Sequence, residues 1–181
     1  MNKYISILRG INVSGQKKIT MADLKALYEQ IGCHDVITYI QSGNVIFTSD
    51  LDDVSALIQQ IEQAIFTQFS FDVPVQVFTV QTFNDALKQL PFNEVSAEQD
   101  GAQVMFTFLS GPCEPDTFAE VEKLADASER IHLINNVIYI HCPNGYGKTK
   151  LSNNMIEKKL NVSATSRNLK TVVKLCELAL V

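Results

Sequence analysis

Two stretches of this chain, a hundred residues apart, follow one pattern of apolar residues and turns, and this repeat constrains the fold most. The first is YISILRG at residues 4–10, and the second is VMFTFLSG at residues 104–111. Each is a strand-sized apolar run that stops at a glycine. Each is followed by a helical pattern and then by two strand-like runs joined by a polar turn, VITYIQSGNVIFTS and RIHLINNVIYIH. The chain therefore resembles an internal duplication of one β-α-β-β-α unit.

The apolar spacing predicts the elements of each half in more detail. In the first half we expect strands at 4–9, 35–41, 44–48 and 73–79 and helices at 20–31 and 53–69. In the second half we expect strands at 103–109, 130–134 and 137–142 and helices at 82–90, 115–127, 149–160 and 168–180. The order β-α-β-β-α-β in the first half is typical of a ferredoxin-like, or split-βαβ, fold. We predict an α+β protein with two related ferredoxin-like halves built on antiparallel sheets, residues 1–80 and 81–181, and an extra C-terminal helix.

The two halves differ in length between their first strand and their hairpin. Thirty-four positions separate Gly10 from Asn44, whereas twenty-five separate Gly111 from Asn136. Most of the excess lies in the loop GINVSGQKK. Surface loops can lengthen at little thermodynamic cost and often carry function. The longer copy is therefore a candidate binding loop.

The residue types of this loop are suited to an anion. Gly10 and Gly15 allow several backbone N–H groups to point at one ligand. The helix expected at 20–31 would add the partial positive charge of its N-terminus. Arg9 and Lys18 supply full positive charges. The alternative interpretation is an ordinary glycine-containing surface connection.

A second glycine-rich loop, PNGYGKTKL, occupies residues 143–151. A Walker A motif needs a glycine five residues before Gly147, where this chain has Cys142, so a P-loop nucleotide hydrolase is excluded. The loop can still bind an anion at a helix start. Two polar segments, TYIQSGNV at 38–45 and ATSRN at 164–168, add hydrogen-bonding groups. Their alternative roles are turn formation and helix capping, the latter by Ser166 or Asn168.

Basic residues are concentrated at the two ends of the chain. Residues 1–20 hold four basic residues and no acidic one, and residues 143–181 hold seven against two, although the net charge is −5. This segregation predicts a positive region where the ends meet, while the whole protein is too acidic for a general nucleic-acid coat.

The apolar runs are too short for a membrane span, and the first residues lack the features of a secretory signal. We therefore expect a cytoplasmic protein.

The motifs of well-known catalytic sites are missing from the sequence. It contains neither G-x-S-x-G nor H-E-x-x-H. His132 and His141 fall in expected strands, where a structural role is more usual than acid–base chemistry. The four cysteines are too widely spaced for a zinc site, and we expect reduced thiols: Cys33, Cys113, Cys142 and Cys176. The sequence therefore predicts no metal, indicates no cofactor and leaves enzymatic activity open.

The loops described above are also the parts of the chain that resemble a known family. The stretch LRGINVSGQKK…TYIQSGNVIFTS resembles the signature LRGINVGG…TYIQSGNV of a widespread bacterial family of unknown function. PNGYGKTKL and TSRNLKTVVKL resemble two further segments of that family, so the resemblance spans essentially the whole chain. It implies an α+β fold with two related ferredoxin-like halves and no established activity. Ser14 stands where members commonly have a glycine, and Leu169 where they have an aromatic residue.

The resemblance groups these distant loops into one hypothesis, a shared site for an anionic small molecule such as a nucleotide or a phosphorylated metabolite. The candidate ligand-binding residues are Arg9, Gly10, Asn12, Gly15, Lys18, Gln41, Ser42, Asn44, Gly145, Gly147, Lys148, Lys150, Arg167 and Asn168. One alternative is an enzyme that acts on a phosphorylated substrate. Another, less favoured, is an RNA-binding module that stacks bases on strand aromatics such as Tyr39, Phe47 and Phe106. The oligomeric state is left open.

Overall fold

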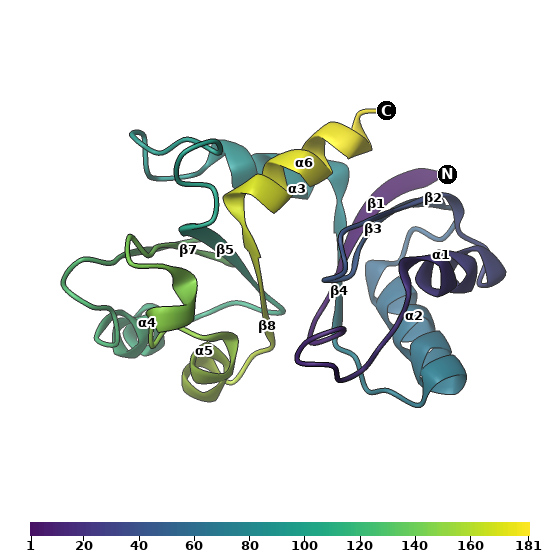
Figure 1. The fold of residues 1–181 in the computed structure, drawn as a ribbon, viewed down its shortest axis with the longest axis horizontal. Helices are drawn as coiled ribbons and strands as arrows, with labels where there is room; N and C mark the ends of the chain where they lie inside the picture. Colours follow the sequence, from purple (N-terminus) through teal and green to yellow (C-terminus); the bar gives the residue numbers. More distant parts are fainter. The chain divides into compact units, whose positions relative to one another are not determined.

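The eight strands of the chain form two four-stranded antiparallel sheets, shown in the computed structural model of residues 1–181 (Figure 1). The residues divide into two compact units. Unit 1 comprises residues 1–84 together with 175–181, and unit 2 comprises residues 85–174. The boundary expected from the sequence repeat, between residues 80 and 81, stays a prediction. None of the helices is both long enough and apolar enough to cross a membrane.

Unit 1 builds one sheet and covers one of its faces with two helices (Figure 1). Its elements are β1 (Asn2–Leu8), α1 (Met21–Gln30), β2 (His34–Tyr39), β3 (Asn44–Ser49), α2 (Val54–Phe69) and β4 (Val75–Thr79). The strand order is β2-β3-β1-β4. Leu24 and Leu57 from the helices pack with Leu8 and Phe47 from the sheet in one buried cluster. Thr20 is the N-cap of α1, because its hydroxyl accepts a hydrogen bond from the Asp23 N–H at 3.0 Å.

Unit 2 repeats this arrangement. Its elements are β5 (Val104–Leu109), α4 (Pro115–Glu122), β6 (Arg130–Ile134), β7 (Val137–His141), the 3₁₀ turn η1 (Tyr146–Lys148), α5 (Asn153–Leu160) and β8 (Ala164–Asn168). The strand order β6-β7-β5-β8 is that of unit 1, strand for strand. Two further helices, α3 (Val80–Lys88) and α6 (Leu169–Ala179), each contain residues of both units. The predicted α+β class with two similar halves is thus confirmed. The assignment of each half to the ferredoxin-like fold stays a prediction.

The sequence-based elements were wrong in two places. Residues 164–168 form β8, which pairs with β5, and are not the loop that the polar sequence ATSRN indicated. The strand exists because β5 offers its backbone groups to this segment, a long-range effect that overrides local propensity. In addition, α4 ends at Glu122 and α5 begins only at Asn153, where Ser152 caps it. Of the two proposed caps, Asn168 is the real one, and its side-chain oxygen accepts the Thr171 N–H at 2.9 Å.

One carboxylate contact is present in both units and shows how closely they correspond. In unit 1 the Val75 N–H at the start of β4 donates to Glu62 of α2 at 2.9 Å. In unit 2 the Ala164 N–H at the start of β8 donates to Glu157 of α5 at 2.8 Å. Each carboxylate therefore joins the second helix of its unit to the first residue of the last strand. We call this contact the carboxylate clamp.

The units differ in which connection is long. Twelve residues, 9–20, link β1 to α1, whereas five, 110–114, link β5 to α4. The connection that leads into the second helix differs in the opposite direction. Four residues, 50–53, link β3 to α2 in unit 1, whereas eleven, 142–152, link β7 to α5 in unit 2. Each unit has thus lengthened a different connection of the shared plan.

Replacing Glu62 with alanine tests the carboxylate clamp. The substitution leaves the Val75 N–H without its acceptor in a partly buried position, so we expect the free energy of unfolding to fall by ~1–3 kcal/mol. Urea denaturation measures the loss. Gln63→Ala is the matched control on the same helix, because Gln63 is exposed and bonds only to Thr67 nearby, so its cost should stay within about 0.5 kcal/mol. Equal losses for the two variants would contradict a specific role of Glu62.

Candidate functional site

The long connection of unit 1 contains a miniature hairpin, residues 12–17, which we call the finger. The Gln16 N–H donates to the Val13 carbonyl at 2.9 Å, and the Asn12 N–H donates to the Lys17 carbonyl at 3.1 Å. Ser14 and Gly15 occupy the turn with φ of 50° and 76°. Positive φ at both central residues defines a type I′ turn, which favours Asn, Asp or Gly at the position that Ser14 takes. The finger is therefore an ordered element that follows the end of β1 (Figure 1).

The side chain of Asn12 holds the base of the finger. Its Nδ2 donates to the Ile19 carbonyl at 2.8 Å and to the Gln41 carbonyl at 2.9 Å, while its Oδ1 accepts the Ile19 N–H at 2.9 Å. Ile11 and Ile19, on either side, are buried. The Lys17 ammonium adds a contact to the Asp72 carbonyl. Asn12 was predicted to bind the ligand, but its side-chain amide instead joins the finger to the β2–β3 turn through the Gln41 carbonyl.

The β2–β3 turn, residues 40–43, is packed against the base of the finger. Gly43 has φ of 78°, and a Cβ atom there would lie 2.7 Å from Ile11 Cδ1 and 2.8 Å from Leu8 Cβ. Asn44 is fully buried, and its Nδ2 donates to the Tyr39 carbonyl at 2.9 Å and to the Ser42 Oγ at 3.1 Å. These signature residues thus have clear structural roles.

The groups of unit 1 that remain accessible to a ligand lie near the finger. Gly15, Lys18 and Gln41 are exposed, as is Gly10, while Arg9 is half-buried. Val13 beside the turn is also exposed, to 58%. This end of unit 1 therefore presents backbone, one lysine and one amide on an anchored loop.

The long connection of unit 2 is held by a network of hydroxyl groups centred on Ser166 of β8. The Ser166 hydroxyl donates to Asn153 Oδ1 at 2.6 Å and lies 2.6 Å from the Thr107 hydroxyl and 3.2 Å from the Tyr146 hydroxyl. Tyr146 belongs to η1, and Asn153 begins α5. The network therefore holds the middle of the glycine-rich segment, at Tyr146, and the helix start that follows it, at Asn153, against the sheet. Sequence analysis missed Tyr146, Thr107 and Asn153, whose partners are distant in the chain.

The predicted ligand-binding residues of unit 2 divide into exposed and buried groups. Gly147, Lys148 and Lys150 are exposed, and Gly145 is half-buried with φ of 94°. Arg167, in contrast, is buried and donates to the Ser166 carbonyl at 2.9 Å. Burial lowers the pKa of Arg167 to about 10, so the side chain is still a cation at neutral pH. The exposed ligand-binding candidates here are therefore the two lysines and the backbone at Gly147.

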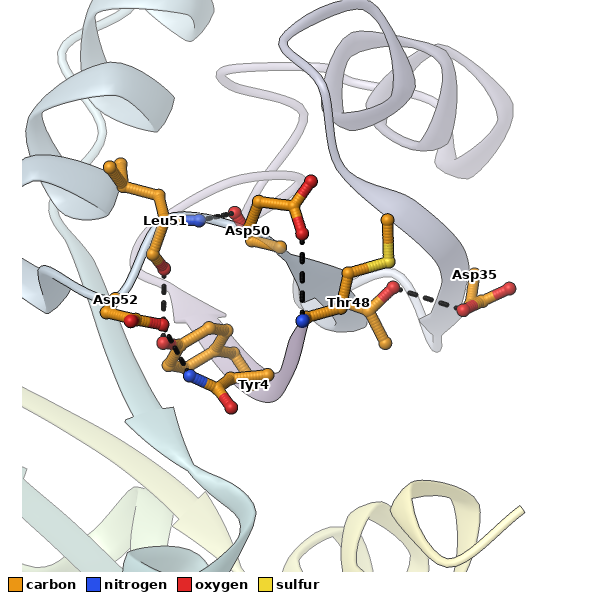
Figure 2. A network of polar contacts seen from close by, with 9 residues as sticks. Tyr4, Asp35, Thr48, Asp50, Leu51 and Asp52 are labelled. Carbon is orange, nitrogen blue, oxygen red and sulfur yellow. Dashed lines mark hydrogen bonds and ion pairs between the residues drawn. The ribbon is translucent and has the colours of Figure 1, made fainter.

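The equivalent end of unit 1 has the opposite character (Figure 2). The amino group of Met1 lies 3.6 Å from Asp50, the Tyr4 hydroxyl donates to the Leu51 carbonyl at 3.1 Å, and Asn2 donates to Asp52. The short connection there is acidic and closed by its own hydrogen bonds. The structure holds no group of three or more His, Cys, Asp and Glu side chains arranged to bind a metal ion.

The comparisons with known proteins agree with this architecture. Residues 1–139 match the family described as "Protein of unknown function (DUF1697)". The chain belongs to this family. A conserved bacterial protein of known structure from Streptococcus pneumoniae is 26% identical, with a TM-score of 0.76 over 98% of each chain. No curated protein matches the chain. The family membership expected from the sequence is confirmed.

The structure brings the predicted segments together in pairs. In unit 1 the first loop meets the β2–β3 turn through Asn12 and Gly43, and in unit 2 the loop 143–151 meets β8 through Tyr146 and Ser166. The single shared site for all four segments stays a prediction.

Replacing Gly43 with alanine tests whether this signature glycine is structural. Positive φ alone costs ~1–2 kcal/mol for a residue with a Cβ, and the contacts with Ile11 and Leu8 add ~1–3 kcal/mol of overpacking. Gly10→Ala is the control, because Gly10 has φ of 77° and nothing within 4 Å of a Cβ. In urea denaturation Gly43→Ala should lose clearly more stability than Gly10→Ala, and similar losses would argue against a packing role.

Replacing Asn12 with aspartate tests the anchoring of the finger. The carboxylate keeps the bond from the Ile19 N–H but faces two carbonyl oxygens, so we expect a loss of ~1–3 kcal/mol in unfolding free energy. Hydrogen exchange at Ile19 should also become faster. Gln16→Glu makes the same chemical change at an exposed position and should alter neither quantity. Unchanged exchange in Asn12→Asp would show that the amide does not hold the finger.

Proposed function

We propose that the protein binds an anionic small molecule, a nucleotide or a phosphorylated metabolite, through its two lengthened loops. The observation that carries this proposal is the difference between the units. Each unit has extended one connection of the common plan, and each extension bears glycines and exposed lysine while its counterpart is short. Extra loop residues are not required by a sheet and two helices, which the shorter copies also form. Ligand binding explains why both extensions carry glycines and exposed lysine.

The finger region suits an anion because it is anchored before a ligand arrives. Asn12 and Lys17 already make their hydrogen bonds, so little further ordering of the loop is needed on binding. Lys18 contributes an exposed ammonium close to Gly15, where a Cβ would lie 3.9 Å from Lys18 Cε. Gly15 permits a phosphate oxygen to approach the backbone closely.

The loop of unit 2 has comparable chemistry. Lys148 and Lys150 are exposed point charges of the kind that proteins use to bind phosphate. Gly147 has nothing within 4 Å of a Cβ position, so an approaching ligand meets open backbone there. Since Tyr146 is hydrogen-bonded to Ser166, the lysines extend from a fixed turn.

The two alternatives are weaker. An RNA-binding sheet stacks bases on exposed aromatic side chains, whereas Phe47, Phe106, Phe108 and Tyr139 are buried in this protein. An enzyme acting on a phosphorylated substrate would use the same two loops and would need a nucleophile or a base beside them. We favour reversible binding because it requires only the glycines and lysines that these loops contain.

Lysine substitutions combined with a ligand panel test the proposal. Nucleotides and phosphorylated metabolites should include at least one compound that raises the Tm of the wild-type protein. Lys18→Ala and Lys148→Ala should each weaken its binding by about fivefold, the loss expected for one exposed charge pair of ~1 kcal/mol. Lys25→Ala and Lys158→Ala, exposed lysines on α1 and α5, are the matched controls and should bind like the wild type. A panel without any stabilising compound, or binding unchanged in both loop variants, would refute the proposal.

A further inference from the structure

Basic side chains gather on the face of the unit 2 sheet that α4 and α5 do not cover. Arg130 and His132 alternate along β6 and therefore share one face. His141 of β7 stands directly opposite Arg130 in the antiparallel register. The intervening residues, such as Ile131 and Ile140, point to the helix-covered face and join its apolar cluster. None of the three basic residues belongs to the loops discussed above.

A buried aromatic ring forms the floor of this basic cluster. Phe92, only 2% exposed, has its ring centroid 5.6 Å from that of His132 and 5.8 Å from that of His141. Arg130 Cζ lies 4.7 Å from the same centroid. A guanidinium held over an aromatic ring is oriented by the attraction between cation and ring, and its N–H edges remain available to an acceptor. The cluster is therefore organised around one fixed group.

The hydrogen bond between Arg130 and His141 fixes which nitrogen of the imidazole is the acceptor. Arg130 Nη2 lies 2.8 Å from His141 Nδ1. A guanidinium has donors only, so Nδ1 of His141 must accept and its ring proton must lie on Nε2. The Arg130–His141 pair thus keeps further N–H donors for an anion, and exposed His132 supplies a third basic group.

A carboxylate of the protein already occupies this cluster. Glu94, two residues after Phe92, makes an ion pair with Arg130, and this contact holds the pKa of the Glu94 carboxyl below its usual value. Both side chains are substantially exposed, Glu94 to 59% and Arg130 to 41%, and exposed ion pairs open readily. Glu129, which immediately precedes β6, accepts the Asp126 N–H at 2.9 Å.

We propose that Arg130, His132 and His141 form a binding site for a small phosphate-type anion, with Phe92 as its floor, and that Glu94 fills the site until such an anion displaces it. The carboxylate of Glu94 shows that Arg130 accepts an oxyanion while it is held over Phe92. A phosphate dianion brings more charge and more acceptor oxygens than one carboxylate. Its apparent affinity is set by competition, since it binds only the fraction of molecules in which Glu94 has moved away.

Titration with inorganic phosphate at constant ionic strength tests this site, with the NMR signals of the His132 and His141 rings as the readout. Glu94→Gln removes the internal competitor, so phosphate should bind about twofold to fivefold more tightly than to the wild type. Glu98→Gln makes the same charge change at an exposed position of the same segment and should leave the affinity unchanged. Arg130→Gln should abolish the phosphate-dependent shifts.

Three results would overturn the proposal. One is the absence of phosphate-dependent shifts at both histidines in Glu94→Gln. Another is an equal gain in affinity for Glu94→Gln and Glu98→Gln, which would reveal a general charge effect. The third is retention of the shifts in Arg130→Gln while circular dichroism shows that the variant is folded. The lysine variants of the two loops should leave these shifts unchanged, so a failure of this proposal can be distinguished from a failure of the proposed loop function.

Discussion

The position of every loop in each unit depends on the register of its central strand. Ser6 of β1 pairs with Val45 on one side and Val77 on the other, and Thr107 of β5 pairs in the same way with Ile138 and Ser166. A shift of one residue would turn every side chain of the strand to the opposite face. Equivalent hydrogen bonds lie at the end of the central strand in both units. The Leu8 N–H donates to the Gly43 carbonyl, and the Leu109 N–H donates to the Asn136 carbonyl, both at 2.8 Å.

This common frame explains why three loop residues, Gly43, Asn12 and Asn44, are harder to replace than apolar residues of the sheets. Apolar residues in a sheet can be exchanged if size and pattern are kept, whereas Gly43 has no room for a side chain. Asn12 and Asn44 are similarly constrained, because Asn12 bonds to backbone groups of Ile19 and Gln41, and Asn44 bonds to the Tyr39 carbonyl and the Ser42 hydroxyl. These three residues therefore have structural roles, and the exposed lysines and glycines of the same loops are the groups that a ligand could reach.

Charge in unit 2 is organised in two separate places. Lys148 and Lys150 lie on the glycine-rich loop, while Arg130 is held over Phe92 on the sheet. The two lysines of the first group are exposed to solvent. The pKa of the Asp126 carboxyl is lowered mainly by hydrogen bonds from Ser128, and the charge of Lys150 adds to this effect. The second is balanced by Glu94. A guanidinium held over an aromatic ring and paired with a carboxylate differs from an exposed lysine on a loop.

The sequence by itself determined the elements whose signals are local. Apolar periodicity located seven of the eight strands, and the unequal spacing of Gly10–Asn44 and Gly111–Asn136 revealed the long loop. It also grouped the chain with its family, because the motifs are contiguous.

Only the tertiary structure decided what depends on partners far along the chain. The strand β8 exists because β5 pairs with it, although ATSRN has the composition of a loop. The three bonds of Asn12, the clamp of Glu62 and the position of Arg130 over Phe92 each join residues that no local pattern connects. Side-chain amides, carboxylates and guanidinium groups meet their partners only after the strands have paired in register. The spacing of residues along the sequence does not give the distance between two such groups in the folded protein.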